Sequence, residues 1–390
     1  MTDRTDPSSA PASAPSTSIP LASPLADLLP EGLADCLPAA AAATTQAMAA
    51  ALEAMDLHGY DRVSPPLVEF EAALARRMNG DSPQRMFRFI DPVSLRTLAL
   101  RSDITPQIGR IAATGLRDAA RPLRLCYAGE VALIRADQLD PTRQRLQLGA
   151  ELIGSDTVAA AAEIVILAVE ALKAAGARDI SVDFTMPDLV DVLAAGPMPL
   201  QAEQIAAVRR ELDTKDAGGL KAAGGDAYLP LLYATGDIER AAELLRGLDD
   251  GGALTSRIDA FEQVAAHVGD AARITLDPTE RHGFEYQSWF GFTLYAANAT
   301  GALGRGGTYH IVGSDEAATG FSLYLDPLID ALTGAIAKRD TLFLPQGHDR
   351  SAADRLRAIG WRTIAALHDA DDAAALGCTH RLIGIDVQPV

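Results

Sequence analysis

Two short segments each carry a pair of polar residues of types that could contact a ligand. Gln147 and Glu151 are four residues apart in a segment that predicts a β-strand, so both side chains lie on one face of the sheet. Asp103 and Thr105 stand at the start of a helix predicted over 104–115. A cationic amine needs a carboxylate and a neutral acceptor, which Asp103 and Thr105 supply. The pair also suits a structural role, with Asp103 as the helix N-cap and Thr105 in the first turn, and both roles can hold together.

Residues for metal or covalent chemistry show no matching pattern. The seven histidines lack metal-ligand spacing, and the sequence contains no P-loop and no nucleophile elbow. The cysteines Cys36, Cys126 and Cys378 are scattered and form neither a disulfide framework nor a zinc site. We therefore expect no metal, no cofactor and no covalent mechanism.

The composition limits the class of protein. A chain of 390 residues has room for one large domain and a small one. It contains no apolar run of about 18 residues, so we expect no transmembrane helix. Residues 1–24 are rich in Ser, Pro, Ala and Thr without an apolar export segment, which predicts a disordered tail and a cytoplasmic protein. The net charge of −18 counts against a nucleic-acid partner such as tRNA, because such partners require clustered Lys and Arg.

The elements that must position these residues follow from apolar periodicity. Helices are predicted at 39–57, with Gly59 as C-cap, and at 104–115, 157–174 and 321–337, together with a helical insertion at about 200–275. Strands are predicted at 60–69, 87–90, 97–100, 123–133, 145–153, 180–184 and 282–296, and after a Gly-rich turn at 301–307. Strands at 341–344, 362–367 and 381–385 alternate with helices at 352–359 and 371–377. The pattern predicts an α+β domain over 25–338 and a small α/β module over 339–390.

Four segments, in the right order, resemble histidyl-tRNA synthetases, which are class II aminoacyl-tRNA synthetases. Segment 126–151 is similar to the ATP-site motif, with the frame Tyr127-Ala128-Gly129, a charged loop and Gln147-Leu148-Gly149-Ala150-Glu151. Segment 59–69 (GYDRVSPPLVE) resembles the dimer-forming motif, and 97–112 (TLALRSDITPQIGRIA) resembles the TLRPE-type loop. The fourth segment begins with 281–286 (RHGFEY), which resembles the RGLDYY-type strand, and continues with 303–310 (LGRGGTYH), which resembles the GGGRYDGL-type strand. The resemblance covers roughly residues 25–335 and implies an antiparallel class II sheet flanked by helices.

The resemblance also implies a pocket for histidine. On the matched motifs, Asp103 and Thr105 hold the α-ammonium group, and Glu151 lies near the ammonium or the imidazole. Arg281 lies in the neighbourhood of the second activating arginine of the family. The tyrosines of the set also suit plain core packing. The full set implied to bind histidine is Asp103, Thr105, Gln147, Glu151, Arg281, Tyr286 and Tyr309.

The sequence departs from the synthetase pattern at the ATP site. Leu133 and Pro327 stand where two separate motifs carry arginines that grip ATP, and Arg145 stands where an aromatic residue usually stacks on adenine. Adenylyl transfer depends on positive charge aimed at the developing negative charge, so losing both arginines is incompatible with efficient adenylate formation. A two-residue shift would make Arg135 the phosphate ligand, and this alternative stays open.

A kept amino-acid pocket beside a lost ATP site resembles the regulatory subunits of ATP phosphoribosyltransferase, which are paralogues of histidyl-tRNA synthetase. This resemblance implies a non-catalytic subunit that dimerises, assembles with a short-form catalytic subunit and mediates histidine feedback. Two alternatives remain, an active histidyl-tRNA synthetase and a synthetase-like module for another amino acid. A further motif, Asp315-Glu316-Ala317-Ala318-Thr319-Gly320, resembles a loop that binds phosphoribosyl pyrophosphate but is one residue short.

Overall fold

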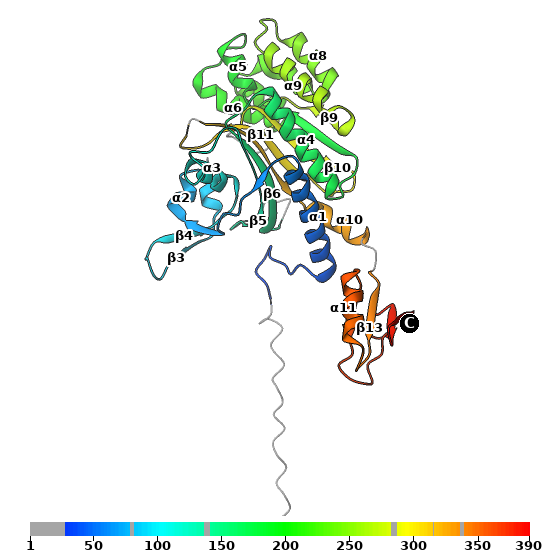
Figure 1. The fold of residues 1–390 in the computed structure, drawn as a ribbon. Coiled ribbons are helices and arrows are strands. Elements are labelled where there is room, and N and C mark those ends of the chain that lie inside the picture. The colour runs from blue at the N-terminus through cyan, green and yellow to red at the C-terminus, as the bar shows by residue number, and fades with distance from the viewer. Residues whose placement is uncertain (1–27, 79–81, 136–140, 282–286, 315, 336–338) are drawn as a thin grey trace, which may run out of the picture.

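The central element is a large sheet that is mostly antiparallel (Figure 1). The computed structural model describes residues 28–78, 82–135, 141–281, 287–314, 316–335 and 339–390, so the expected tail at 1–24 lies outside the described residues. The strands of the sheet are, in spatial order, β1 (Asp61–Arg62), β5 (Leu123–Ala132), β6 (Gln144–Ile153), β12 (Ala317–Tyr324), β11 (Gly304–His310), β10 (Gln287–Ala296), β7 (Ile180–Thr185), β9 (Arg273–Leu276) and β8 (Gly236–Asp237). Only the pairs β1–β5 and β7–β9 run parallel among these strands.

The two faces of this sheet carry different residues. One face packs against the helices α1 (Pro38–Leu57) and α4 (Val158–Ala174) through an apolar core that includes Leu148, Ala150 and Phe321. The opposite face packs against α3 (Thr105–Ala113) and carries Gln147 and Glu151. Because strand side chains alternate between faces, the polar residues gather on the α3 side.

The helices α1 and α4 form as the sequence predicts. In α1, Ala43, Ala47, Ala51 and Met55 are buried at a spacing of four residues, which builds the stripe that packs on α4. Gly59 follows the C-cap of α1 with φ +81°, a conformation that favours glycine. Thus a strongly Ala-rich sequence gives a helix narrow enough to lie close to its neighbour.

A small antiparallel sheet lies beside α3, on the same side of the large sheet as that helix (Figure 1). Its strand order is β2 (Val68–Phe70), β4 (Thr97–Leu100), β3 (Arg88–Ile90), and it is accompanied by α2 (Glu71–Ala75) and the 3₁₀-helix η2 (Ser82–Arg85). The expected pairing of the two strands around 87–100 is confirmed. Asp91 fixes the turn between them, since its carboxylate accepts the backbone N–H groups of Val93 and Ser94.

The segment predicted as a helical insertion at 200–275 is largely helical. Its elements, with the helix that precedes it, are α5 (Leu189–Ala195), α6 (Ala202–Asp213), α7 (Ala217–Ala222), η3 (Asp226–Tyr233), α8 (Ile238–Leu248), α9 (Thr255–Val268) and η4 (Gly269–Ala271). Of these, α9 packs on α4 and α8 packs on β9, so the segment covers one end of the large sheet (Figure 1).

Two local expectations in the main fold are wrong. The Gly-rich stretch at 301–307 is not only a turn, because Gly304 already belongs to β11. The stretch 321–337 is not one helix: β12 continues to Tyr324, and α10 (Asp326–Ala335) begins only afterwards. Residues 321–325 are apolar with a period of two as well as with helical spacing, and pairing with β6 and β11 selects the strand.

The last residues form a small α/β module below α10 in Figure 1. Its strand order is β14 (Arg362–Ala365), β13 (Thr341–Leu344), β15 (His380–Ile383), β16 (Asp386–Pro389), with the helix α11 (Arg350–Ala358). The helix expected at 371–377 is absent, since the described residues 373–377 form turns. Asp371 accepts the backbone N–H groups of Leu367 and His368, and such local bonds compete with a helix. The α+β class and its small module are confirmed, whereas the domain boundaries stay a prediction.

Candidate functional site

The site is centred on the carboxyl group of Glu151, in the middle of β6. Its side chain is 1% exposed. The hydroxyl of Tyr309 on β11 donates to Oε2 at 2.7 Å, and the hydroxyl of Thr105 at the start of α3 donates to Oε1 at 3.2 Å. A third hydroxyl, from Tyr127 on β5, donates to Oε1 at 3.4 Å. Three separate elements therefore converge on one buried acid.

The protonation of Glu151 follows from this environment. Burial raises its pKa from 4.5 to about 8, while the hydrogen bond from Tyr309 acts in the opposite direction and the nearby charge of Asp103 raises the pKa further. Below about pH 8 the buried carboxyl group is thus mostly neutral. A cation or an N–H donor placed against it would favour the ionised form, as expected of a carboxyl group in a binding pocket.

Gln147 joins the site to the segment before α3. Its Oε1 accepts the backbone N–H of Ile104 at 2.9 Å, and its Nε2 donates to Asp103 Oδ1 at 2.7 Å and to Ser322 Oγ at 2.8 Å. The N-cap of α3 is Ile104 rather than Asp103, and Asp103 Oδ1 accepts the N–H of Thr105 at 3.0 Å. Among the described residues Asp103 Oδ2 makes no hydrogen bond, so it stays available for a ligand.

A row of glycines keeps the sheet bare beside Glu151. Gly320 is its direct partner on β12, Gly307 pairs with Gly320 from β11, and Gly291 pairs with Gly307 from β10. Direct cross-strand partners share a face. A Cβ at Gly320 would overlap the Glu151 carboxylate, and a Cβ at Gly291 would overlap Gln287 and Thr185. The row therefore leaves room for functional side chains and for a cavity.

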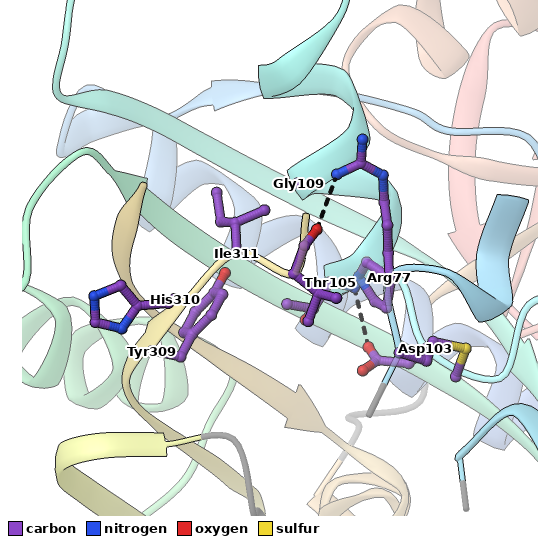
Figure 2. Close-up of a pocket in the computed structure, with 10 residues that line it drawn as sticks. Arg77, Asp103, Thr105, Gly109, Tyr309, His310 and Ile311 are labelled. Atoms are coloured by element: carbon purple, nitrogen blue, oxygen red, sulfur yellow. Dashed lines mark hydrogen bonds between the residues drawn. The ribbon is translucent and has the colours of Figure 1, made fainter. Parts of the chain in front are cut away.

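Two adjoining cavities open on this face. The Arg77 cavity, of about 520 Å³ including its opening to solvent, is lined by Arg77, Met78, Asp103, Thr105, Pro106, Gly109 and the segment 309–312 (Figure 2). The Glu151 cavity, of about 270 Å³, is lined by Thr105, Glu151, Gln287, Arg305, Gly306, Gly307, Tyr309, Gly320, Phe321 and Ser322. Thr105 and Tyr309 line both cavities. The two cavities therefore adjoin at these two residues.

Tyr127 and Ser322 belong to the site although the sequence analysis did not select them. Tyr127 is fully buried, and its hydroxyl lies 3.1 Å from both Thr105 Oγ1 and Ser322 Oγ. Gly149, opposite Tyr127 on β6, makes room for the ring, since a Cβ there would overlap the hydroxyl. Gly149, which lies between Gln147 and Glu151 on the same face, was the feature of the sequence that could have indicated a large neighbouring side chain there.

Packing also explains the glycine at position 129, in the Tyr127-Ala128-Gly129 frame. The guanidinium group of Arg101, which is buried, would be overlapped by a Cβ at Gly129. Arg101 Nε donates to the carbonyl of Glu130 at 2.7 Å, and Nη1 donates to that of Pro65 at 2.9 Å. Arg101 thus ties the segment before α3 to β5 and holds Asp103 in place.

Two residues expected in the site are not found there among the described residues. Tyr286 lies outside the described residues. Arg281 stands beside α6, where its backbone N–H donates to Asp213 Oδ1 at 2.8 Å, and it lines neither the Arg77 cavity nor the Glu151 cavity as described. The structure thus brings together Asp103, Thr105, Gln147, Glu151 and Tyr309 from the expected set.

The positions expected to grip ATP are occupied differently. Leu133 follows β5, and its backbone N–H donates to the carbonyl of Arg143 at 2.8 Å. The guanidinium carbon of Arg145 lies 5.3 Å from the ring centroid of Tyr324, within the range of a cation–π contact. Pro327 lies in the first turn of α10, where it supplies no charge. Arg135 is exposed at the end of the described segment, and its role as a substitute stays a hypothesis.

Most of the motif at 315–320 lies in a strand rather than in a loop. Asp315 lies outside the described residues, and 317–320 belong to β12. Both carboxylate oxygens of Glu316 accept hydrogen bonds from Arg121. The described part of the motif is therefore engaged in strand pairing and in an ion pair.

The described residues include no cluster of His, Cys, Asp and Glu suited to hold a metal ion. Within the described part of the chain, every helix is too short or too polar to cross a membrane.

Comparisons with known proteins agree on one family. The sequence model described as histidyl-tRNA synthetase matches residues 32–328. A protein of Rhodospirillum centenum named ATP phosphoribosyltransferase regulatory subunit is 38% identical over 377 residues, covering 93% of this chain and 96% of the relative. One of the same name from Paramagnetospirillum magneticum is 41% identical over 367 residues, covering 91% and 96%.

Solved structures give the same picture of the fold. The crystal structure of an ATP phosphoribosyltransferase regulatory subunit/histidyl-tRNA synthetase from Bacillus halodurans C matches with a TM-score of 0.75 and 25% identity, covering 91% of this chain and 97% of that chain. The histidyl-tRNA synthetase from Nostoc sp. PCC 7120 also matches with a TM-score of 0.75, at 16% identity, covering 92% and 91%. The class II synthetase architecture expected from the sequence is therefore confirmed.

Proposed function

Because this chain belongs to the family of ATP phosphoribosyltransferase regulatory subunits, we propose that it binds histidine without activating it and reports the occupancy of the pocket to a separate catalytic subunit. The observation that carries the proposal is the buried carboxyl group of Glu151, which three hydroxyl groups hold beside an open cavity. A pocket that binds an amino acid and does not consume it is a sensor.

The two carboxyl groups of the site match the two nitrogen-bearing groups of histidine. Asp103 receives the α-ammonium group through its Oδ2, with Thr105 as a neutral neighbour. Glu151 receives the imidazole, together with the hydroxyl of Tyr309. Gln147 fixes Asp103 in position. Arg281 and Tyr286, the other two residues that the resemblance implies to bind histidine, remain in the proposal.

Adenylate formation is not part of this function. Leu133 and Pro327 supply no charge to phosphate, and the loss of one such donor typically costs on the order of 10²–10³ in rate. The contact between Arg145 and Tyr324 supports the same conclusion, since the guanidinium group of Arg145 packs on a ring of the protein itself.

The partner in this proposal is a short-form ATP phosphoribosyltransferase catalytic subunit, which requires this chain for activity and for feedback by histidine. A self-dimer forms the core of the assembly, as in class II synthetases. Histidine acts on a distant active site by binding two states of the assembly with different affinity. Nucleic acid is not a partner, in keeping with the net charge of −18.

Copurification with a short catalytic subunit, followed by calorimetry of the full chain with a panel of amino acids, tests this function. We expect histidine to bind preferentially, and Asp103→Asn to weaken it by about ten- to a hundredfold because a charge-assisted bond is lost. An Asp118→Asn variant, at an exposed aspartate outside both cavities, is the matched control. Robust ATP–pyrophosphate exchange with histidine would instead identify an active synthetase, and preference for another amino acid would reject histidine as the ligand.

A further inference from the structure

We propose that Arg77 anchors the α-carboxylate of the bound amino acid, so that the ligand joins the segment after α2 to the large sheet. This inference rests on the proposed function and names the part of the ligand that the Asp103 and Glu151 contacts leave unexplained. The juxtaposition that carries it is that of Arg77 and Asp103, which line the same cavity (Figure 2).

A free amino acid needs a positive partner in this site. Its carboxylate is charged at neutral pH, and burying an unpaired charge is costly. Asp103 is acidic and repels a carboxylate, and Glu151 receives the imidazole in the proposed function. Among the described residues that line the two cavities, the arginines are Arg77 in one and Arg305 in the other.

The position of the ammonium group selects Arg77. The α-carboxylate and the α-ammonium group of an amino acid are attached to the same carbon, so both must lie in one cavity. Asp103 lines the Arg77 cavity and is absent from the lining of the Glu151 cavity. The side chain of the ligand then passes Thr105 and Tyr309, which line both cavities, and ends at Glu151.

Arg77 is also chemically available. Its one hydrogen bond among the described residues is a long one, from Nη1 to the carbonyl of Val312 at 3.4 Å. The nearby acid Glu69 is already engaged, because it accepts two hydrogen bonds from Arg110 at 2.6 and 3.1 Å. Burial and then the charges of Arg110 and Arg76 lower the pKa of Arg77. A carboxylate in the cavity would offset this crowding of positive charge.

The anchor gives the ligand a mechanical role. Arg77 follows α2 beside the small β2–β4–β3 sheet, whereas Glu151 lies on β6 of the large sheet. An intact amino acid connects the two parts through its opposite ends. An amine that lacks the carboxylate fills the Glu151 cavity and reaches Asp103 without making this connection.

Calorimetry of the full chain with histidine and histamine tests the anchor, since histamine keeps the imidazole and the ammonium group but has no carboxylate. We expect the wild-type chain to prefer histidine by about ten- to a hundredfold. Arg77→Met should weaken histidine while leaving histamine unchanged or tighter, so that the preference disappears. Arg77→Lys should keep part of it, because the charge remains but the planar fork is lost.

The controls separate the anchor from general charge effects and from misfolding. Arg76→Met removes an exposed neighbouring charge that lies outside the cavity lining, and it should keep the preference. Arg77→Gln is a second neutral variant, used where Arg77→Met lowers the unfolding temperature. A wild-type chain that binds neither ligand would overturn the proposed function itself. Two results would overturn the anchor alone. One is histidine binding without preference over histamine. The other is a preference that survives Arg77→Met and Arg77→Gln but is lost in Arg305→Met or Arg281→Met.

Discussion

The carboxyl group of Glu151 lies directly over Gly320, its cross-strand partner on β12. A Cβ at Gly320 would overlap Oε2 of Glu151 and crowd the carbonyl oxygen of Ala150 at 2.8 Å. The side chain of Glu151 therefore occupies the space that a neighbouring strand leaves empty, and the position of the buried acid depends on the absence of a side chain at 320.

Gly320→Ala should displace the Glu151 carboxyl group and destabilise the protein by about 1–3 kcal/mol, the usual cost of overpacking. Histidine binding should fall with it. Gly334→Ala in α10 is the matched control, because nothing lies within 4 Å of a Cβ there and alanine favours a helix. Urea denaturation of both variants measures the difference. Equal stability of the two variants would contradict the steric relationship.

The raised pKa of Glu151 predicts that stability falls with pH. The folded chain keeps the proton up to about pH 8, whereas the unfolded chain loses it near its ordinary pKa of 4.5. Between these values the folded state binds more protons, so the free energy of unfolding declines with rising pH by about 1.4 kcal/mol per unit. Glu151→Gln carries no such proton and should gain stability relative to wild type across this window. Parallel pH profiles from urea denaturation would refute the raised pKa.

Histidine binding should release a proton from the pocket. A cationic or N–H donor group against Glu151 favours its ionised form, so the proton held at pH 7 leaves when the ligand binds. Calorimetry in two buffers of different ionisation enthalpy measures the number of protons released. The wild-type chain should release a substantial fraction of one proton. Glu151→Gln should release less, and an unchanged value in that variant would assign the proton to another group.

Arg101→Lys should destabilise the chain, because a lysine cannot reproduce the fork that donates to the carbonyls of Glu130 and Pro65. With one buried carbonyl left without a donor, we expect a loss of about 1–3 kcal/mol. Arg117→Lys is the control, since Arg117 is exposed and, among the described residues, donates only to the carbonyl of Ala113, at 3.3 Å. The two unfolding midpoints should differ clearly, and similar midpoints would contradict a clamp at Arg101.

Local sequence signals identified much of the fold and of the site. Asp103 and Thr105 stand at the start of a helix with a proline in its first turn, and Gln147 and Glu151 lie on one face of a strand. The relative position of the two residues within each pair was therefore predictable from the local sequence. The two pairs meet around one carboxyl group because β6 and α3 face each other. This expectation came from the resemblance of the matched motifs. A single segment read alone does not give this long-range contact.

Other features depended on contacts that no local pattern contains. Tyr127 and Ser322 join the site because Gly149 lies between them in the register of β5, β6 and β12. The residues from Phe321 to Leu325 fit a helix or a strand equally well, and only pairing with the strands on either side decided the outcome. Arg77 reaches the cavity from the segment after α2, and the sequence of that segment gives no sign of this.

The glycines Gly291, Gly307 and Gly320 also affect the cohesion of the sheet. Side-chain pairs between neighbouring strands usually contribute about 0.2–1 kcal/mol each, and this row supplies none. Its three strands are joined there by main-chain hydrogen bonds and by the apolar layer on the opposite face. Gly307 and Gly320 line the Glu151 cavity, so a ligand there would add contacts across β11 and β12, and we expect these strands to be stiffer when the cavity is filled.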